Sequence, residues 1–214
     1  MSKRGLFITL EGSEGCGKTT QAGLLKGNLR ERGIEIVSTR EPGGSSIGDS
    51  IRTILLSEKY APSHMAELLL YGAERAQHVE EVVKPALEAG KWVLCDRYGD
   101  ATRAYQCFGR GLAREKVERV QALATGGLEP DLTLLFLLPV EEGLKRARER
   151  NGASPLGEGR FEAESIAFHR RVAEGYAALA KEFPERIVAL DATGSREKVF
   201  ERVLKVLEGR VELS

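Results

Sequence analysis

A glycine-rich octapeptide near the start of the chain constrains the fold more than any other stretch. Residues 12–19 read Gly-Ser-Glu-Gly-Cys-Gly-Lys-Thr, the spacing of a loop whose backbone N–H groups surround phosphate oxygens. The apolar run at 6–10 precedes it as a buried strand would, and leucines recur at helical spacing through 21–32. Because a helix N-terminus adds unpaired N–H donors, the strand, this phosphate loop (residues 12–19) and the helix together predict a nucleotide-binding α/β domain.

The residues of the phosphate loop have the chemistry that a nucleoside triphosphate and Mg²⁺ require. The Lys18 ammonium can reach the β- and γ-phosphates, and the Thr19 hydroxyl can ligate Mg²⁺. The alternative, a glycine turn with a chance lysine, is disfavoured by the flanking strand and helix. We expect the triphosphate to contact Gly12, Ser13, Glu14, Gly15, Cys16, Gly17, Lys18, Thr19 and Thr20.

Predicted strands and helices alternate from one end of the chain to the other. Four further strands are expected at 34–39, 92–95, 132–138 and 187–190. Helices are expected at 47–57, 65–89 with Pro85 as a kink or break, 100–107, 113–124, 140–150, 161–182 and 196–208. This order predicts an α/β, P-loop NTPase fold: a five-stranded mostly parallel sheet with helices on both faces. We expect one domain over residues 1–214, with a short lid at about 151–160, where the sequence is rich in glycine.

Composition and charge disfavour several classes of protein. Lysine plus arginine and aspartate plus glutamate both number 32, and the resulting zero net charge argues against a broad basic surface for nucleic acid. No run of about 18 apolar residues is present, so we expect no membrane span, no signal peptide and a cytoplasmic location. Cys16, Cys95 and Cys107 lack the spacing of a zinc site or a disulfide framework, so free thiols are expected.

Charged residues follow the predicted strands at the edge where parallel sheets bind ligands. Asp96 ends an apolar strand, the usual place for an outer partner of Mg²⁺, although a helix cap is the alternative. Arg40 and Arg97 also stand at strand ends, where a guanidinium matches phosphate oxygens; the alternative is a solvated surface arginine. We therefore predict a metal site at Thr19 and Asp96, with arginines beside it.

The full set of motifs resembles the thymidylate kinases, and the resemblance extends over essentially the whole chain. The motifs that carry it are Glu11-Gly12…Gly17-Lys18-Thr19, Thr39-Arg40-Glu41-Pro42-Gly43-Gly44, Asp96-Arg97-Tyr98 with Ala104-Tyr105-Gln106, Pro130-Asp131-Leu132-Thr133 and Asp191-Ala192-Thr193. Many families share the phosphate loop, but the second and third motifs together are specific. The resemblance implies a nucleoside monophosphate kinase that transfers the γ-phosphoryl group of ATP to dTMP, giving dTDP and ADP, with Mg²⁺ as cofactor.

The resemblance also implies where the acceptor nucleotide binds. The family's substrate-binding positions correspond to Arg40, Tyr71, Arg75, Arg97, Thr102, Tyr105 and Gln106. Arg40 and Arg97 would hold the 5′-phosphate of dTMP, Tyr71 would stack on thymine, Arg75 would hydrogen-bond the base, and Tyr105 would pack beneath the deoxyribose. The i, i+4 spacing does put Tyr71 and Arg75 on one helix face, although core packing is the alternative for Tyr71.

The catalytic residues implied by the resemblance are Lys18, Arg97, Arg160 and Glu14. No variable position of the phosphate loop is basic, so a further cation is expected from the lid. Arg160 precedes an apolar residue and a glutamate as the family's lid arginine does, and Arg150 is the second choice. Arg146 would lie against the adenine of ATP, with a bare surface arginine as the alternative.

Two further features qualify the resemblance. Ala101 stands where the family has a serine, which leaves Thr102 as the nearby hydroxyl. Relatives are homodimers, and the apolar stretch Met65–Val83 either supplies such an interface or faces the sheet.

Two other functions compete with phosphorylation of dTMP. A kinase for another nucleoside monophosphate is disfavoured by Arg-Glu-Pro-Gly-Gly and by the pair Tyr71 and Arg75. A non-catalytic ATP-binding module would not need both acceptor arginines, and the chain lacks the Asn-Lys-x-Asp motif of a GTPase switch. His64, His78 and His169 fit no catalytic or metal spacing and are given no role.

Overall fold

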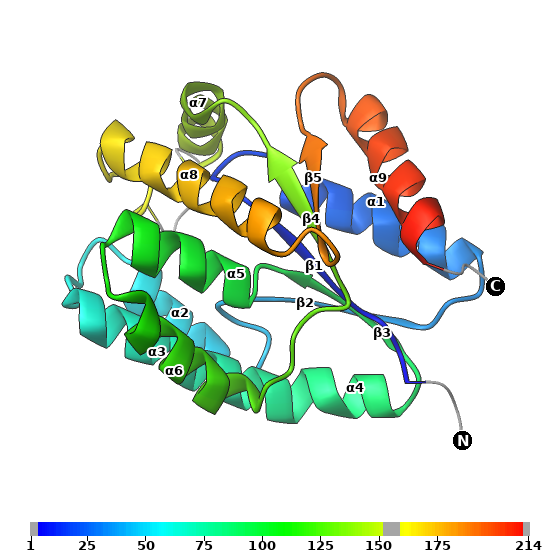
Figure 1. Ribbon diagram of the computed structural model, residues 1–214, viewed down its shortest axis with the longest axis horizontal. Coiled ribbons are helices and arrows are strands. Elements are labelled where there is room, and N and C mark those ends of the chain that lie inside the picture. Colours follow the sequence, from blue (N-terminus) through cyan, green and yellow to red (C-terminus); the bar gives the residue numbers. More distant parts are fainter. Residues whose placement is uncertain (1–3, 152–158, 212–214) are drawn as a thin grey trace.

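The computed structural model describes residues 4–151 and 159–211, and its centre is a five-stranded sheet (Figure 1). The strands are β1 (Phe7–Gly12), β2 (Ile36–Arg40), β3 (Trp92–Asp96), β4 (Leu132–Leu137) and β5 (Ile187–Asp191). They lie in the order β2-β3-β1-β4-β5, and each neighbouring pair of these strands is parallel. The predicted α/β fold is therefore confirmed, and the described sheet is wholly parallel.

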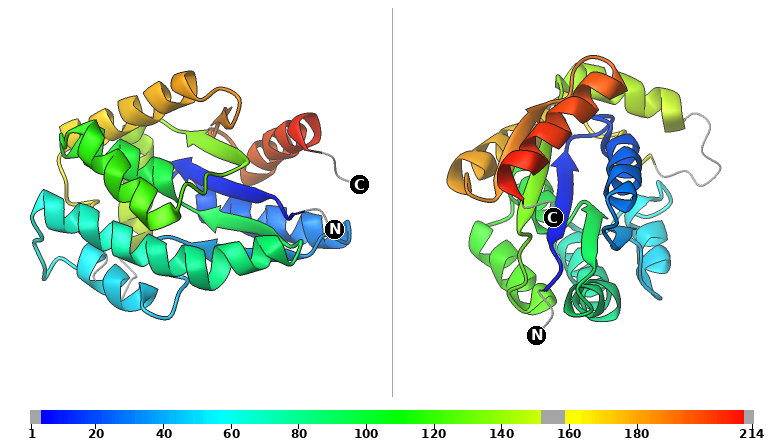
Figure 2. Two further views of the ribbon diagram at one scale, coloured as in Figure 1. Left: turned by 60° about the horizontal axis from the view of Figure 1, so that its bottom comes forward. Right: turned by 90° about the vertical axis from the view of Figure 1, so that its right-hand side faces the viewer.

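Helices cover both faces of the sheet (Figures 1 and 2). They are α1 (Lys18–Glu31), α2 (Gly48–Leu56), α3 (His64–His78), η1 (Val79–Val83), α4 (Lys84–Glu88), α5 (Gly99–Thr102), η2 (Arg103–Gly109), α6 (Arg114–Thr125), α7 (Val140–Asn151), α8 (Ile166–Glu182) and α9 (Arg196–Arg210). On one face, Leu25 of α1 and Val203 of α9 belong to the same hydrophobic cluster as Leu10 of β1. On the other face lie α8 and η2, together with η1 and α4, whose apolar side chains form two further clusters.

The burial of the strands follows from this layering. Every residue of β1 is buried, as are all but the last of β4, because these two strands have neighbours on both edges and helices on both faces. Each fully buried leucine or isoleucine contributes about 1.5–3 kcal/mol to stability. The long apolar runs that predicted these strands are thus the runs that form the centre of the sheet.

The register of the parallel strands places the carboxyl ends of β1, β2 and β3 side by side in the sheet. Asp96 of β3 pairs with Leu10 of β1 and with Arg40 of β2, and Gly12 pairs with Phe136 of β4. Parallel strands place their carboxyl ends at the same edge, so the phosphate loop, Arg40 and Asp96 converge there.

The predicted helix at 161–182 begins five residues too early. The structure has a turn over 160–164, and α8 starts at Ile166 after Ser165, whose hydroxyl accepts a hydrogen bond from the backbone N–H of Phe168. The N-cap therefore sets the start of the helix, and Arg160 and Phe161 lie outside it.

The predicted helix at 65–89 is helical throughout, but it is not uniform. A π-helical turn, η1, joins α3 to α4, and Pro85 lies in the first turn of α4. Proline has no N–H to give to the preceding turn, and a wider turn before it accommodates that loss without ending the helix. The predicted helix at 100–107 likewise divides into α5 and the π-helical η2.

In the described ranges, no helix combines the length and apolarity that a membrane-spanning segment needs.

Candidate active site

A cavity of about 1140 Å³ opens at the carboxyl ends of the strands. From the phosphate loop and the start of α1 it is lined by Glu14, Gly15, Gly17, Lys18, Thr19 and Thr20. From the predicted acceptor set it is lined by Arg40, Tyr71, Arg75, Thr102, Tyr105 and Gln106. Asp96, Arg97 and Arg146 also face it. The structure thus brings most of the predicted site residues to one cavity, while Gly12, Ser13, Cys16 and Arg160 are not part of its lining.

The phosphate loop folds back around its own lysine. Lys18 Nζ donates to the carbonyl oxygens of Gly12 and Ser13, both at 3.0 Å, and lies 3.5 Å from Cys16 Sγ. Gly15 has a φ of +69°, and a Cβ atom there would stand 2.0 Å from the carbonyl oxygen of Gly143. No side chain fits at position 15, so this loop position cannot carry a basic residue.

A hydroxyl and a carboxylate meet beside the loop at the predicted metal position. Thr19 Oγ1 donates to Asp96 Oδ2 at 2.9 Å. The pair joins the first turn of α1 to the end of β3, and both residues face the cavity.

Arg97 lies at the junction between the phosphate loop and the predicted acceptor side. Its backbone φ is +71°, unusual for a residue with a side chain, and this conformation follows directly after β3. Its Nη1 donates to the carbonyl oxygen of Gly12 at 3.1 Å, and its Nη2 donates to Glu14 Oε1 at 2.8 Å. Tyr105 Oη donates to the same Glu14 oxygen at 2.7 Å, and its ring stacks with Arg97, with 5.0 Å from the guanidinium carbon to the ring centroid. Burial alone would lower the pKa of Arg97, but Glu14, Tyr105, Tyr176 and Glu11 together outweigh it and raise that pKa.

Arg75 is held by a buried network rather than standing free for a ligand. Its side chain is 1% exposed; Nε donates to Glu41 Oε2 at 2.7 Å, and Nη1 donates to Thr102 Oγ1 at 3.0 Å and to Gln121 Oε1. Gln121 in turn donates to the carbonyl oxygen of Gly99 at 2.6 Å. Arg75 still reaches the cavity, so its predicted contact with a base stays a prediction.

Glu41 and His78 extend this network to β2. Glu41 Oε1 lies 2.8 Å from His78 Nδ1, and His78 Nε2 lies 2.7 Å from Thr39 Oγ1. The sequence reasoning gave His78 no role and used Glu41 only as a motif position. The motif Arg-Glu-Pro-Gly-Gly could have pointed to Glu41, whereas nothing in the spacing of α6 indicated Gln121.

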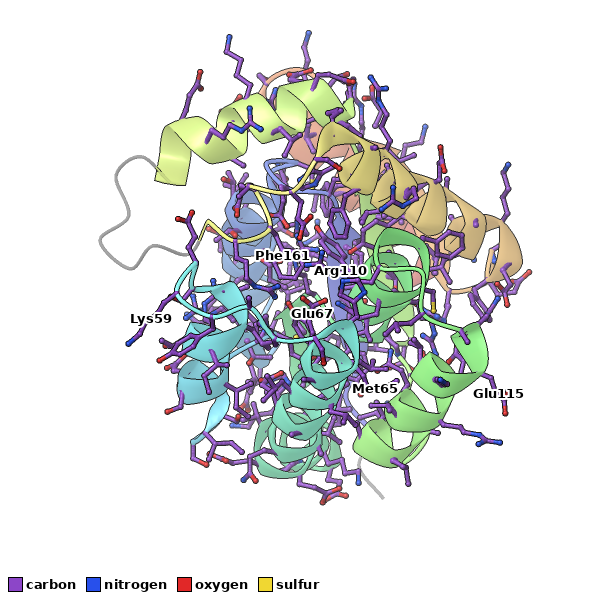
Figure 3. The ribbon with its side chains drawn as sticks, turned by 90° about the vertical axis from the view of Figure 1, so that its left-hand side faces the viewer. Lys59, Met65, Glu67, Arg110, Glu115 and Phe161 are labelled. Carbon is purple, nitrogen blue, oxygen red and sulfur yellow. The ribbon has the colours of Figure 1, made fainter. Side chains whose placement is uncertain are left out.

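Gln106 faces the cavity from η2 and is tied to α3. Its Nε2 donates to Glu67 Oε1 at 2.9 Å. Glu67 also accepts from Arg110, at 3.0 Å from Nε to Oε1 and 3.1 Å from Nη2 to Oε2. Figure 3 shows Glu67 and Arg110 facing one another beside Phe161. The sequence analysis missed Glu67 and Arg110, which are adjacent only in the folded chain.

Arg160 is turned away from the cavity. Its Nη1 lies 2.7 Å from Glu67 Oε2, its Nε donates to the carbonyl oxygen of Leu55, and its backbone N–H donates to that of Leu56 at 3.3 Å. Phe161 and Glu162 line the cavity instead. The catalytic role of Arg160 stays a prediction. The side chain of Arg150 and lid residues 152–158 lie outside the described parts of the structure.

Three other predicted residues have partners that were not foreseen. Arg146 faces the cavity and pairs with Glu142 Oε1 at 2.5 Å. Arg40 is exposed, and its Nη2 lies 3.6 Å from Asp49 Oδ1. Ala101, in place of the family's serine, uses its backbone N–H to donate to Glu11 Oε1 at 3.1 Å.

Glu11 is a buried carboxyl group beneath the phosphate loop that sequence reasoning treated only as a motif position. It accepts from the backbone N–H of Tyr98 at 2.8 Å and from Tyr176 Oη at 2.8 Å. Burial, reinforced by the charge of Asp100, raises the pKa of Glu11 from 4.5 to about 7.

Comparison with known proteins places this cavity in a defined family. A family model described as thymidylate kinase matches residues 10–203. The thymidylate kinase of Trichlorobacter lovleyi is 55% identical over 190 residues, covering 88% of this chain and 90% of that protein. The thymidylate kinase of Pelobacter propionicus is 52% identical over 210 residues, covering 97% of this chain and 96% of that protein. The crystal structure of thymidylate kinase from Ehrlichia chaffeensis aligns with a TM-score of 0.77 at 30% identity, over 95% of this chain and 99% of that one. The agreement of sequence over most of the chain with the fold around the cavity shows that the chain belongs to the thymidylate kinase family.

Proposed function

We propose that the cavity carries out the family's reaction, transfer of the γ-phosphoryl group of ATP to dTMP, with the residue roles given below. One observation carries this proposal: Lys18 of the phosphate loop and Arg97 of the acceptor side donate to the same atom, the carbonyl oxygen of Gly12, at 3.0 and 3.1 Å. A phosphate bound by Lys18 and a phosphate bound by Arg97 would therefore lie side by side, as transfer between them requires.

The acceptor phosphate needs no general base. Its second pKa is about 6, so it is largely a dianion at neutral pH and already nucleophilic. The chain's task is to bring two anions into line and to neutralise the charge of the group in transfer. Lys18 acts at the β- and γ-phosphates, while Arg97 and Arg40 act at the 5′-phosphate of dTMP. Glu14, bonded to Arg97, orients that guanidinium between the two phosphates.

Mg²⁺ fits the pair Thr19 and Asp96. A hydroxyl and a carboxylate 2.9 Å apart at the cavity wall are the oxygen ligands that Mg²⁺ prefers, and few protein ligands suffice because phosphates and waters complete its shell. When bound, the ion would neutralise charge on the β- and γ-phosphates.

The thymine base would lie against α3 and η2. Tyr71 supplies a ring for stacking, and Arg75 supplies N–H donors fixed by Glu41. Tyr105 lies beneath the deoxyribose and disfavours a 2′-hydroxyl. Thr102 lines the cavity, but its hydroxyl oxygen already accepts from Arg75. On the donor side, Arg146 lies against adenine.

The further cation for the transition state comes from Arg160. The phosphate loop has no basic variable residue and cannot hold a side chain at position 15. Arg160 pairs with Glu67, so it would exchange this carboxylate for phosphate oxygens when both substrates are bound. A guanidinium delivered in this way is worth about 10³–10⁵ in rate in related phosphoryl transfers.

The proposal extends to the whole chain. Residues 1–214 would form one nucleoside monophosphate kinase domain with its lid at about 151–160, supported by the single sheet that joins the described strands. The protein would act on small nucleotides in the cytoplasm, where ATP is supplied. It would act there as a homodimer, supported by Leu69 of α3 and Leu123 of α6, which are 53% and 86% exposed.

A coupled assay of ADP release tests this function. With ATP and Mg²⁺, we expect turnover with dTMP, weaker turnover with dUMP and little with CMP or AMP. Preference for CMP or AMP would instead support a kinase for another nucleoside monophosphate. ATP binding without ADP release for any acceptor would support a non-catalytic module.

A further inference from the structure

The amide of Gln106 is satisfied on one side only. Its Nε2 donates to Glu67 Oε1 at 2.9 Å, while its Oε1 is buried and has no hydrogen-bond partner among the described residues. The residue is 1% exposed and lines the cavity. A buried carbonyl oxygen without a partner costs about 1–3 kcal/mol, so a donor supplied by a ligand would be favoured at this point.

Glu67 decides which end of the amide faces that ligand. An ionised carboxylate can only accept hydrogen bonds, so the amide nitrogen has to face Glu67 and the carbonyl oxygen has to face away from it. Were the amide reversed, two acceptor oxygens would meet in a buried place.

The charge of Glu67 is itself fixed by two arginines. Arg110 donates to both of its oxygens, and Arg160 Nη1 lies 2.7 Å from Oε2. Burial alone would raise the pKa of Glu67, but the hydrogen bonds of Arg110 and Gln106 and the charges of Arg110 and Arg160 outweigh it and hold that pKa below 4.5. Arg110 keeps both of its bonds to Glu67 when Arg160 leaves for the phosphates, so Glu67 stays ionised at neutral pH and the orientation of the Gln106 amide stays fixed with it. Figure 3 shows Glu67 of α3 beside Arg110, which follows η2, and Phe161, which lies in the turn before α8.

The result is a cavity wall with donors and an acceptor. Arg75 and Gln106 both line the cavity. Nε and Nη1 of Arg75 already donate within the protein, and the carbonyl oxygen of Gln106 has no partner among the described residues. Thymine and uracil have the complementary edge, an O4 acceptor beside an N3–H donor. Cytosine has the reverse, an N4 amino donor beside an N3 acceptor.

We propose that Glu67 is a positioning residue for base specificity: it orients the Gln106 amide so that its carbonyl oxygen meets an N3–H donor, which selects thymine-type acceptors over cytosine. Glu67 acts through Gln106 and does not touch the nucleotide. The proposal rests on the proposed function, since it assumes that the base of dTMP lies against this wall.

Glu67→Gln tests it, because a neutral amide at position 67 can either donate or accept and leaves Gln106 free to turn. We expect kcat/KM to fall about 10- to 100-fold for dTMP and equally for dUMP, which has the same edge. We expect the ratio of kcat/KM for dTMP to that for dCMP to fall by at least the same factor. Any effect on Arg160 and the lid acts on all acceptors alike and cancels in this ratio.

Glu164→Gln is the matched control. It removes the other carboxylate partner of Arg110 but leaves the contact between Glu67 and Gln106 intact, so the ratio should stay at the parent value. In a Gln106→Ala background, Glu67→Gln should no longer change the ratio. A parent-like ratio in Glu67→Gln, or an equal change in the Gln106→Ala background, would overturn the proposal.

If Glu67→Gln does not fold, neutron diffraction from deuterium-exchanged crystals of the parent chain with dTMP decides the matter. We expect the Gln106 deuterons toward Glu67 and the carbonyl oxygen toward N3 of thymine; the reverse would overturn the proposal. A parent chain that does not prefer dTMP to dCMP would contradict the proposed function itself. A parent that prefers dTMP, with the ratio retained in Glu67→Gln, would contradict only the role of Glu67.

Discussion

At the scale of single residues, much of the site depends on groups that share one acceptor. Gly12 O accepts from both Lys18 and Arg97, and Glu14 Oε1 accepts from both Arg97 and Tyr105. Removing one donor from such an oxygen leaves the other in place, so the fold should survive substitutions that remove a catalytic charge.

Lys18→Ala should lower kcat at least about a hundredfold, because a positive charge at the β- and γ-phosphates is lost in the transition state. The melting temperature should change little, since Arg97 still donates to Gly12 O. Coupled ADP release and thermal unfolding measure the two effects, with Lys205→Ala, exposed on α9, as the control. A folded Lys18→Ala chain with near-parent kcat would contradict the role of Lys18.

Glu11 should make stability depend on pH. Its pKa is raised from 4.5 to about 7 by burial and by Asp100. Between these values the folded chain keeps a proton that the unfolded chain has lost, so the contribution of Glu11 to stability is present below about 4.5 and is lost as pH rises through about 7.

Glu11→Gln cannot ionise. Relative to the parent, its free energy of unfolding should therefore rise by about 3 kcal/mol between about pH 4.5 and about pH 8. Urea unfolding of both chains across this range measures the difference. A difference that does not change with pH would mean that Glu11 titrates normally.

Residues in sequence motifs could be predicted, and residues that support them could not. The phosphate loop and Thr19 were predicted because a motif fixes both their types and their spacing, and Asp96 was predicted because it ends an apolar strand. The structure brings all three to the cavity. Glu67 was missed because it acts on Gln106, 39 positions away, and Gln121 because it acts on Arg75, 46 positions away. Neither Glu67 nor Gln121 stands in a motif.

At the scale of elements, the junction between the lid and α8 is the part that periodicity described least well. The apolar spacing from 161 onward suggested a helix, but the Ser165 cap delays it to Ile166. The turn before the cap lets Arg160 reach α3 and the end of α2, and lets Phe161 face the cavity. The strands were predicted within about two residues, because buried parallel strands are continuous apolar runs.

Arg160→Ala should lower kcat at least about a hundredfold, with smaller changes in KM for ATP and dTMP, since the cation serves mainly the transition state. Arg170→Ala is the control, because Arg170 is exposed on α8 and pairs with Glu141. Steady-state kinetics with ATP and dTMP measures the effect on kcat and the effect on each KM separately. If Arg150→Ala loses turnover and Arg160→Ala does not, Arg150 is the lid arginine. If neither variant loses turnover, the cation comes from another part of the chain.

At the scale of the whole molecule, two neighbouring helices each carry an exposed leucine. Leu69 and Leu123 lie on α3 and α6, helices that pack together on the same side of the sheet. The proposed homodimer would bury both side chains between its two chains.

The parent chain should sediment as a dimer, and the double variant Leu69→Asp/Leu123→Asp should sediment as a monomer, because two buried charges would then face each other across the interface. Ile54→Asp, on α2, is a control that changes exposed apolar surface elsewhere. Sedimentation velocity over a range of concentrations measures the state. A monomeric parent, or a dimeric double variant, would contradict the proposed homodimer.

The π-helical turn η1 has a consequence for how this chain can vary in length. It stands between Arg75, which faces the cavity, and Val83, which packs against the sheet. Each residue of an α-helix turns the chain by about 100°, so losing one residue from 79–83 would rotate the first half of the helix by that angle relative to the second. Tyr71 and Arg75 would then leave the cavity while Val83 kept its place. Evolution can therefore exchange the exposed side chains Glu80 and Glu81 of η1, while Val79 and Val83 have to stay apolar. An insertion or deletion there would leave a folded chain without its base-reading face.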